Sequence, residues 1–348
     1  MRFRAIEAVV PSRRLSNDDI VREIIAINKD RLSGRTLRLI TLALEQLFAK
    51  AGTNVRYIRD DGETAGELTA RAGEAALKAS GLAPGDIDLL IYVGVGRGYI
   101  EPAMANAFQD RLGLVNATCF DILDACASWL RALHVAQAFF QGGFYKRIMI
   151  LNGEFNAREY ADFQFDGVSD LRHSFAQFTV GEAATATILE ASDDDVDYYA
   201  SFKTYGDLRA LCMIPLPGAD EFNTAPLPEF ARPLHFFSQS RELFEEGIAK
   251  AISHYHADGN INTYTSDIAF GHAASDTACT RVANECGSRL AQFYRVHGDY
   301  GNTVSASVPL AMHNALKAGR LKSNDRVLIG LSSAGLSTAW ARFRFLSG

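Results

Sequence analysis

The chain has 348 residues, 48% of them hydrophobic and 22% charged, and its formal net charge is −6. This balance is typical of a globular protein large enough for two domains, and it excludes a disordered or fibrous chain. It also argues against a general nucleic-acid-binding protein, which carries a basic surface. No apolar run reaches the roughly 18 residues of a membrane span, and no signal-peptide pattern follows Met1. We therefore expect a cytoplasmic protein without a membrane span.

The predicted elements of the first half alternate between strands and helices. A strand-like run after Met1 stops at Pro11, and Ser16 with Asp19 forms a near capping box that opens a helix reaching about residue 25. Helical spacing and continuous apolar runs then predict helices at 36–51, 66–80, 103–112 and 126–140, and strands at 88–94, 118–122, 147–152 and 183–189.

The second half follows the same order of elements. Residues 155–178, rich in aromatic residues and Asp, show no clean period and are predicted to form an irregular lid or interface segment. After it, strands are predicted at 198–205, 267–270, 326–331 and 337–345, and helices at 238–254, 275–286 and 303–317. The alternation indicates an α/β protein. We expect two pseudo-duplicated halves, residues 1–192 and 193–348, packed together without a linker.

Five cysteines are scattered along the chain without a C-x-x-C pair, which predicts free thiols and no metal site. One of them, Cys126, lies where the predicted strand at 118–122 leads into a helix. The unpaired N–H groups and the dipole of a helix N-terminus stabilise a thiolate, the form that attacks thioesters. The alternative is a buried cysteine that acts only as a small hydrophobic residue.

Two later segments offer partners for Cys126. His272 ends the run Asp-Ile-Ala-Phe-Gly-His just past a predicted strand, and Asn302 lies in a glycine turn that opens a helix. Strand ends at one edge of an α/β sheet are where active sites gather. An imidazole can take a thiol proton, and a carboxamide N–H can polarise a carbonyl oxygen. Taken alone, a histidine like His272 is more often a structural residue, and an asparagine like Asn302 is more often a cap or turn residue.

Together the three segments resemble the Cys-His-Asn triad of β-ketoacyl-acyl carrier protein synthase III, in the thiolase superfamily. Three further segments agree: Val180-Gly-Glu-Ala-Ala-Thr resembles the family's glycine-rich strand, the run from Ala318 resembles its penultimate strand, and Ser332-Ser-Ala-Gly lies at its final glycine-rich turn. The resemblance implies a thiolase fold, a five-layered αβαβα arrangement, with acyl-thioester chemistry on the cysteine.

The resemblance also implies the partners of the reaction. The substrates would be acyl-CoA or an acyl carrier protein, the enzyme would be a homodimer, and neither a metal nor a redox cofactor would be needed. The tetrahedral oxyanion would be held by the backbone N–H of Cys126 and by one from the Ser333–Gly335 turn, with Ala334 and Gly335 as the candidates.

A narrower resemblance concerns the segment Arg97-Gly-Tyr-Ile-Glu-Pro. It is similar to the R-x-Y-L-E-P segment of the OleA thiolases, which join two fatty acyl-CoA molecules. In that subgroup the glutamate enters the partner subunit's active site and removes an α-proton, which implies this role for Glu101. The alternative is a carboxylate at a helix N-terminus followed by Pro102 at the first helical position.

The sequence also departs from the synthase III pattern. The family usually continues past its histidine as H-Q-A-N-x-R, whereas here the run is His272-Ala-Ala-Ser-Asp-Thr. Together with a long segment between about residues 20 and 55, this favours a specialised enzyme over the initiator of ordinary fatty-acid synthesis. Two other functions stay open: acyl transfer to a hydroxyl or amine, and a non-catalytic partner subunit.

Overall fold

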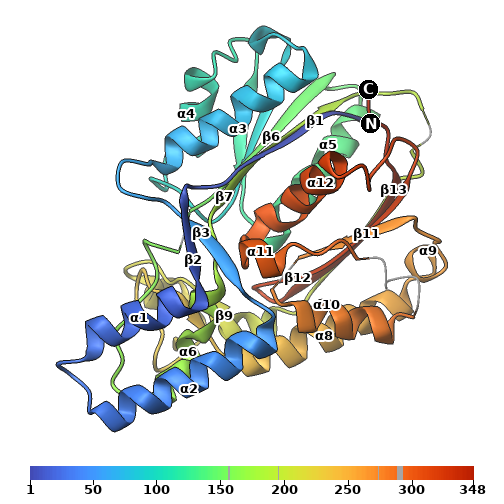
Figure 1. Ribbon diagram of the computed structural model, residues 1–348. Helices are drawn as coiled ribbons and strands as arrows, with labels where there is room; N and C mark the ends of the chain where they lie inside the picture. Colours follow the sequence, from blue (N-terminus) through green and yellow to red (C-terminus); the bar gives the residue numbers. More distant parts are fainter. Residues whose placement is uncertain (156, 195, 273, 288–292) are drawn as a thin grey trace.

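The computed structural model describes residues 1–155, 157–194, 196–272, 274–287 and 293–348 (Figure 1). Residue 156 of the predicted irregular segment and Ala273 beside His272 therefore lie outside the described residues. The chain folds as an α/β protein around two main sheets, as predicted, and its two ends lie side by side. Phe3 N–H donates to the carbonyl of Leu346 at 2.8 Å.

The two sheets have similar strand orders. The first is β1-β7-β6-β4-β5 and the second β8-β13-β12-β11. In each, a parallel set (β5, β4 and β6, or β11 and β12) meets an antiparallel pair. An isolated parallel bridge from Ala269 to Phe293 takes the place that β5 has in the first sheet. The strands are β1 (Arg2–Val9), β4 (Leu89–Val93), β5 (Thr118–Ile122), β6 (Arg147–Glu154), β7 (Ala183–Glu190), β8 (Tyr199–Thr204), β11 (Ile268–Gly271), β12 (Arg326–Ser333) and β13 (Ser337–Arg344).

Helices cover both sheets, and two of them fill the space between the sheets (Figure 1). The central pair is α5 (Ser128–Gln141) and α12 (Ser307–Lys317). The outer helices are α3 (Ala65–Ser80) and α4 (Met104–Arg111) on the first sheet, and α8 (Ser240–Ala257) and α10 (Asp276–Glu285) on the second. The largest core cluster joins Trp129 and Met312 of the central pair to Ile150 of the first sheet and Phe270 of the second. The predicted five-layered αβαβα thiolase fold is confirmed.

The sequence explains why these elements occupy these layers. All five residues of β4 are buried, as expected for a central strand covered by helices on both faces. Helix α12 buries eight of its residues, from Ser307 to Ala315, because a sheet lies on either side of it. A helix that is apolar nearly all round belongs in the interior.

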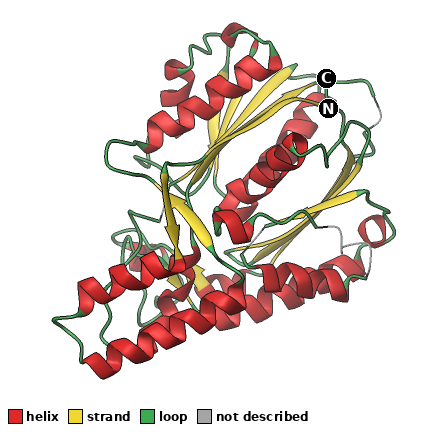
Figure 2. Ribbon diagram, viewed as in Figure 1, coloured by secondary structure: helices red, strands yellow, loops and turns green. Residues whose placement is uncertain are grey.

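A helix pair projects from this layered body, at the lower left of Figure 2. Along the chain, helices α1 (Asn17–Asn28) and α2 (Gly34–Ala51) come after the short strand β2 (Arg13–Ser16) and before the short strand β3 (Val55–Ile58). The predicted capping box is present: Asp19 N–H donates to Ser16 Oγ at 3.2 Å, and Ser16 N–H to Asp19 Oδ2 at 2.8 Å. Gly52, at φ +75°, ends α2 as predicted.

The segment predicted to be irregular is built of short turns of helix. They are η3 (Val168–Asp170), α6 (Leu171–Ser174) and η4 (Phe175–Thr179). We call residues 157–179 the lid. A second irregular stretch carries η5 (Gly206–Leu211), β9 (Cys212–Met213), α7 (Ala219–Phe222) and β10 (Phe237–Ser238), and the remaining short helices are η1 (Pro84–Asp86), α9 (Gly259–Asn262) and α11 (His297–Tyr300).

Three helices start two or more residues later than predicted. The helix predicted from residue 126 begins at Ser128, because Cys126 lies in the preceding turn η2 (Ala125–Ala127). The helix predicted from residue 303 begins at Ser307, after η7 (Val304–Ala306). Residue 238, predicted to open a helix, belongs to β10 instead, since its backbone pairs with β9. No helix in the described ranges is long and apolar enough to cross a membrane.

Candidate active site

The three predicted catalytic residues line one cavity. Cys126, His272 and Asn302 reach it from η2, from the end of β11 and from the turn before η7, and Ala334 joins them from the turn between β12 and β13. The first two follow the carboxyl ends of parallel strands, β5 and β11, one in each sheet. Because such ends gather functional groups in α/β folds, the layered architecture itself brings a residue of each half to one point.

The cavity has a volume of about 1020 Å³ and is walled mainly by apolar side chains. This is at the upper end of the size typical for small-molecule sites. Its walls come from α2, the lid, α8, α10 and the second sheet, and include Leu47, Leu171, Phe175, Ile248, Val282 and Trp340. Three exposed cations, Lys50, Arg172 and Arg241, also border it. Two exposed carboxylates, Glu242 and Glu245, border it as well. The cavity therefore suits an apolar chain, with charges of both signs at its border.

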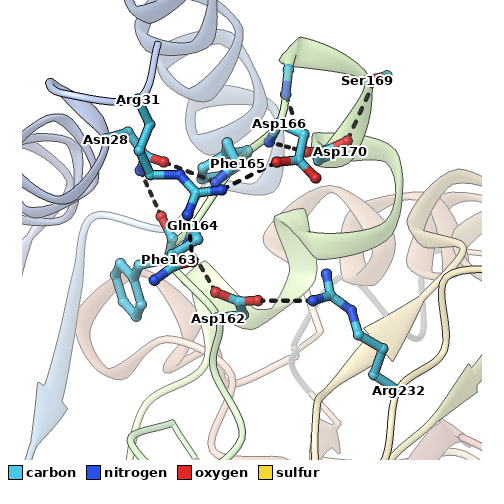
Figure 3. Close-up of polar contacts among 11 residues, drawn as sticks. Asn28, Arg31, Asp162, Phe163, Gln164, Phe165, Asp166, Ser169, Asp170 and Arg232 are labelled. Carbon is cyan, nitrogen blue, oxygen red and sulfur yellow. Dashed lines mark hydrogen bonds and ion pairs between the residues drawn. The ribbon is translucent and has the colours of Figure 1, made fainter.

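The lid forms one wall of the cavity and rests on the helix pair. Leu171, Phe175 and Phe178 share a buried cluster with Ile24 and Phe48 of α1 and α2. Polar contacts tie the same surfaces together (Figure 3). The amide of buried Asn28 donates to the carbonyl of Phe163 at 2.7 Å, and the N–H of Phe165 donates to Asn28 Oδ1 at 2.9 Å. Asn28 thus satisfies two backbone groups of the lid at once.

Exposed ion pairs flank this buried contact. Arg31 donates to Gln164 Oε1 at 3.0 Å and to Asp166 Oδ1 at 3.2 Å, and Arg232 lies 3.8 Å from Asp162 (Figure 3). Such contacts on the surface add little stability. The buried amide and the shared apolar cluster hold the lid in place.

Cys126 sits on a tight turn that two elements fix. Ala125 has φ +42°, a strained value for a residue with a side chain. Ser333 holds the turn from β12, because its Oγ accepts from Ala127 N–H at 3.2 Å and donates to the carbonyl of Asp124 at 2.9 Å. The second half of the chain therefore positions the thiol of the first.

The resting form of Cys126 is the thiol. Burial raises the pKa of Cys126 well above its usual range, and the nearby Cys212 and Glu154 raise it further. The backbone N–H groups of Ala334 and of Cys126 itself lower this pKa, but by less. The expectation that the helix N-terminus holds a thiolate is therefore wrong for the resting state, because desolvation outweighs the N–H groups. A base has to take the thiol proton as the sulfur attacks.

His272 lines the same cavity as Cys126. Its Nδ1 lies 3.3 Å from Ser307 Oγ at the start of α12. Burial lowers the pKa of His272 to about 4, with a further lowering from His297 and a smaller opposing effect from the Val304 backbone. The imidazole is thus neutral at pH 7 and can accept a proton.

Asn302 presents its amide nitrogen to the cavity. Its Oδ1 accepts from the N–H of Val304 at 2.9 Å, which leaves the NH2 group for a ligand. The backbone of Asn302 is held as well, by N–H donation to the carbonyl of Thr179 at 2.8 Å and by accepting from Gly181 N–H at 3.0 Å. Asn302 is therefore a turn residue that also borders the cavity.

The two predicted oxyanion residues differ in placement. Ala334 lines the cavity, and its N–H approaches the sulfur of Cys126 closely enough to lower the pKa of that thiol. Gly335, at φ +131°, is not among the described residues that line the cavity. Of the two, Ala334 is the one placed to donate to an oxyanion.

Glu101, like Gly335, is a predicted site residue that lies apart from the others. It is exposed and does not line the cavity among the described residues. Its loop begins at Val95, which does line the cavity. The loop is anchored by Asp121 of β5, whose carboxylate accepts from Met104 N–H at 2.8 Å and lies 3.7 Å from Arg97. Within a single chain, the loop points Glu101 away from Cys126.

Several residues around the site were not predicted from the sequence. Glu154, Ser305 and Ser307 support the turn between Asn302 and α12, and Cys212 lines the cavity near Cys126. Only Glu154 carried a signal, a charged residue that ends a buried apolar strand. In the described part of the chain, no group of three or more His, Cys, Asp or Glu side chains is arranged to hold a metal ion.

Comparison with known proteins places the chain in a family. Residues 120–207 match the model of 3-oxoacyl-[acyl-carrier-protein] synthase III, and residues 257–345 match the model of that synthase's C-terminal part. The chain belongs to this family of thiolase-fold condensing enzymes. A curated relative from Sulfurovum sp. (strain NBC37-1), a β-ketoacyl-[acyl-carrier-protein] synthase III, is 28% identical and the match covers 99% of this chain and 95% of the relative.

Solved structures agree on the fold. The synthase III of Aquifex aeolicus VF5 matches with a TM-score of 0.79 at 21% identity, covering 99% of each chain. OleA of Xanthomonas campestris, solved with bound lauric acid and lauroyl-CoA, matches with a TM-score of 0.83 at 21% identity, covering 99% of this chain and 98% of that one. The predicted class, a condensing acyltransferase of the thiolase superfamily, is confirmed.

Proposed function

We propose that the chain transfers an acyl group from a thioester to Cys126 and then condenses it with a second thioester to give a β-keto product. One observation carries this proposal: Cys126, His272, Asn302 and Ala334 converge on a single apolar cavity large enough for a long chain. The donor would be an acyl-CoA or an acyl carrier protein. The exposed cations Lys50, Arg172 and Arg241 along the cavity suit the phosphates of either one.

In the first half-reaction the sulfur of Cys126 attacks the thioester carbonyl. Its proton passes to His272 and then to the departing thiolate, so the acyl–carrier bond breaks as the acyl–cysteine bond forms. The backbone N–H groups of Cys126 and Ala334 hold the oxyanion between these events. One such donor typically contributes about 2.7–4 kcal/mol to lowering the barrier.

In the second half-reaction the carbonyl of another thioester lies against Asn302 and His272, and the amide NH2 donates to its oxygen. The α-carbon becomes nucleophilic by loss of CO2 or by loss of a proton to a carboxylate. It forms a carbon–carbon bond with the acyl group, and the bond to the sulfur of Cys126 breaks. The thiolate released takes up a proton and the enzyme returns to its resting form.

For the proton-abstraction route, Glu101 of a second copy would serve as the base. Strand β5 is the edge of the first sheet, and the apolar side chains of Ile100 and Leu123 beside it are exposed. Leu123 also lines the cavity, so this edge and the cavity adjoin. Pairing of two copies along β5 would cover these side chains and carry each Glu101 toward the other copy's site.

Intact-protein mass spectrometry after incubation with a panel of acyl-CoAs tests the first half-reaction. A mass increase on Cys126 that disappears in Cys126→Ala is the expected result, and the preferred chain length follows from the panel. The absence of any adduct with CoA or carrier-protein donors would contradict the proposal. If two acyl-CoAs yield no carbon–carbon bond while an added alcohol or amine becomes acylated, the chain is an acyltransferase that acts on hydroxyl or amine groups instead of a condensing enzyme.

Glu101→Gln tests the base. Acylation of Cys126 should be unchanged, condensation of two simple acyl-CoAs should disappear, and condensation with a malonyl thioester should survive. Mixed dimers of Glu101→Gln with Cys126→Ala then test the crossing between copies. Each such dimer contains one site with both an intact Cys126 and an intact Glu101 from the other chain, so activity should return. No recovery on mixing would place the base in its own chain.

A further inference from the structure

The turn that carries Asn302 is supported by a buried carboxylate that does not line the cavity. Glu154, at the end of β6, is fully buried. Its Oε1 accepts from the backbone N–H of Ser305 at 3.2 Å and also from the Ser305 hydroxyl, and its Oε2 accepts from the N–H of Val95 at 3.2 Å. Each oxygen of one side chain thus holds a different loop of the site.

The first of these loops is strained and carries Asn302. Val304 has φ +48°, a conformation that a β-branched residue adopts only when its surroundings enforce it. The N–H of Val304 orients the amide of Asn302, and the Val304 backbone contributes to the environment of His272. Ser305, the next residue, is gripped by Glu154 and by the amide of Asn152, which donates to its Oγ at 3.0 Å. The turn therefore keeps its shape through these contacts.

The second loop leads to Glu101. Val95 opens the 95–103 segment, and its N–H is the group that Glu154 holds. Beyond Val95 the segment is anchored at Asp121 through Arg97 and Met104. The same carboxylate therefore holds both the first residue of the loop that carries Glu101 and the turn that carries Asn302.

We propose that Glu154 is a positioning residue for the condensation half-reaction. It holds the Asn302 turn and the start of the Glu101 loop in fixed positions relative to each other. The inference rests on the proposed function and adds a role to it. A purely structural carboxylate would be better placed far from the nucleophile. Glu154 instead lies close enough to Cys126 for its charge to raise the pKa of the thiol, which hinders the first half-reaction. The contacts of Glu154 with Ser305 and Val95 serve the second half-reaction instead.

These opposed effects give the test a distinctive signature. Glu154→Gln removes the charge while its single amide oxygen can still accept from Ser305, but its NH2 group then meets the N–H of Val95 donor to donor. Besides burial, the groups that bear on the pKa of the Cys126 thiol are Glu154, Cys212 and the backbone N–H groups of Ala334 and of Cys126 itself, while Asp124 nearby is paired with Arg131 at 2.9 Å. Only the first of them is altered by the substitution.

The experiment measures two rates in each variant: alkylation of Cys126 by iodoacetamide as a function of pH, and single-turnover condensation from the preformed acyl-enzyme. In Glu154→Gln the alkylation profile should move to lower pH, whereas condensation should slow by about 10-fold to 100-fold, the usual effect of one lost buried hydrogen bond partner. Glu154→Asp, which keeps the charge, should leave the alkylation profile in place.

Ser305→Ala is the matched control, since it removes a contact to the turn and keeps the carboxylate. It should slow condensation without moving the alkylation profile, and it decides the matter if Glu154→Gln fails to fold. Equal losses in both rates, or no loss of condensation in either variant, would overturn the inference. Alkylation needs no thioester, and wild-type acylation is measured separately, so failure of the proposed function is recognised independently of failure of this role.

Discussion

The catalytic centre and the lid are held in place by different kinds of interaction. At the centre, a local hydrogen bond fixes the turn or side chain of each reactive residue: Ser333 for Cys126, Ser307 for His272 and Val304 for Asn302. The lid rests on an apolar cluster shared with α1 and α2, on one buried amide and on exposed ion pairs (Figure 3). The chemistry is thus built into the layers, whereas the lid and the helix pair shape the wall of the cavity.

The largest expected effect would show whether the lid depends on the layered body. Arg59 contacts the buried Glu182 with its Nη2 at 3.3 Å and also pairs with Glu159 of the lid. Arg59→Met should lower the free energy of unfolding by about 3–5 kcal/mol, because it leaves a buried carboxylate uncompensated. Urea denaturation measures it. Arg158→Met, which breaks an exposed lid pair with Asp61, is the control and should change stability by less than about 1 kcal/mol. Similar losses of unfolding free energy in both variants would show that the buried ion pair contributes no more than the exposed one.

The second effect concerns the centre alone. Asn302→Ala removes the amide donor proposed for the second thioester. Single-turnover condensation should fall by about 10²-fold to 10³-fold, the loss typical of one preorganised donor. Acylation of Cys126, followed by mass spectrometry, should proceed at nearly the wild-type rate. If acylation falls to the same degree, the turn supports the nucleophile as well, and the division between half-reactions is incorrect.

The third prediction separates pocket shape from chemistry. Asn28→Ala leaves the carbonyl of Phe163 and the N–H of Phe165 without their partner, which should destabilise the lid by about 1–3 kcal/mol. The preferred acyl length in a panel of acyl-CoAs should shift or broaden, while alkylation of Cys126 stays unchanged. Arg31→Ala removes only exposed contacts to the same lid segment and should leave the length profile as it is.

The smallest effect is a pH dependence confined to the centre. The pKa of His272 is lowered to about 4, so the unfolded chain binds its proton before the native one does as the pH falls. Stability should therefore decline between about pH 6.5 and pH 5, by about 1.5 kcal/mol from this group. His272→Asn should flatten that part of the stability curve relative to wild type. An unchanged slope would show that the imidazole is not buried as a neutral group.

The sequence was informative about the fold and the site where the residues follow a recognisable motif or period. The Cys126, His272 and Asn302 segments and the alternation of strands and helices predicted the fold and three members of the site. The direction in which the pKa of Cys126 shifts could not be predicted. Burial and the nearby Cys212 and Glu154 raise this pKa, and their effect depends on packing between distant segments. The role of Glu154 also depends on residues about 60 and 150 positions away, and no local spacing encodes such contacts.

The shared cluster of lid and helix pair bears on how such a protein can diversify. Substitutions in α1 and α2 can reshape the cavity through the lid without altering Ser333, Ser307 or Val304. The lid itself meets the centre at Thr179, whose carbonyl accepts from the N–H of Asn302. A lineage can then explore new ligands by drift in two outlying helices, with the risk to catalysis kept low. In this architecture, the selectivity for the acyl chain and the reactivity of the catalytic residues can change independently.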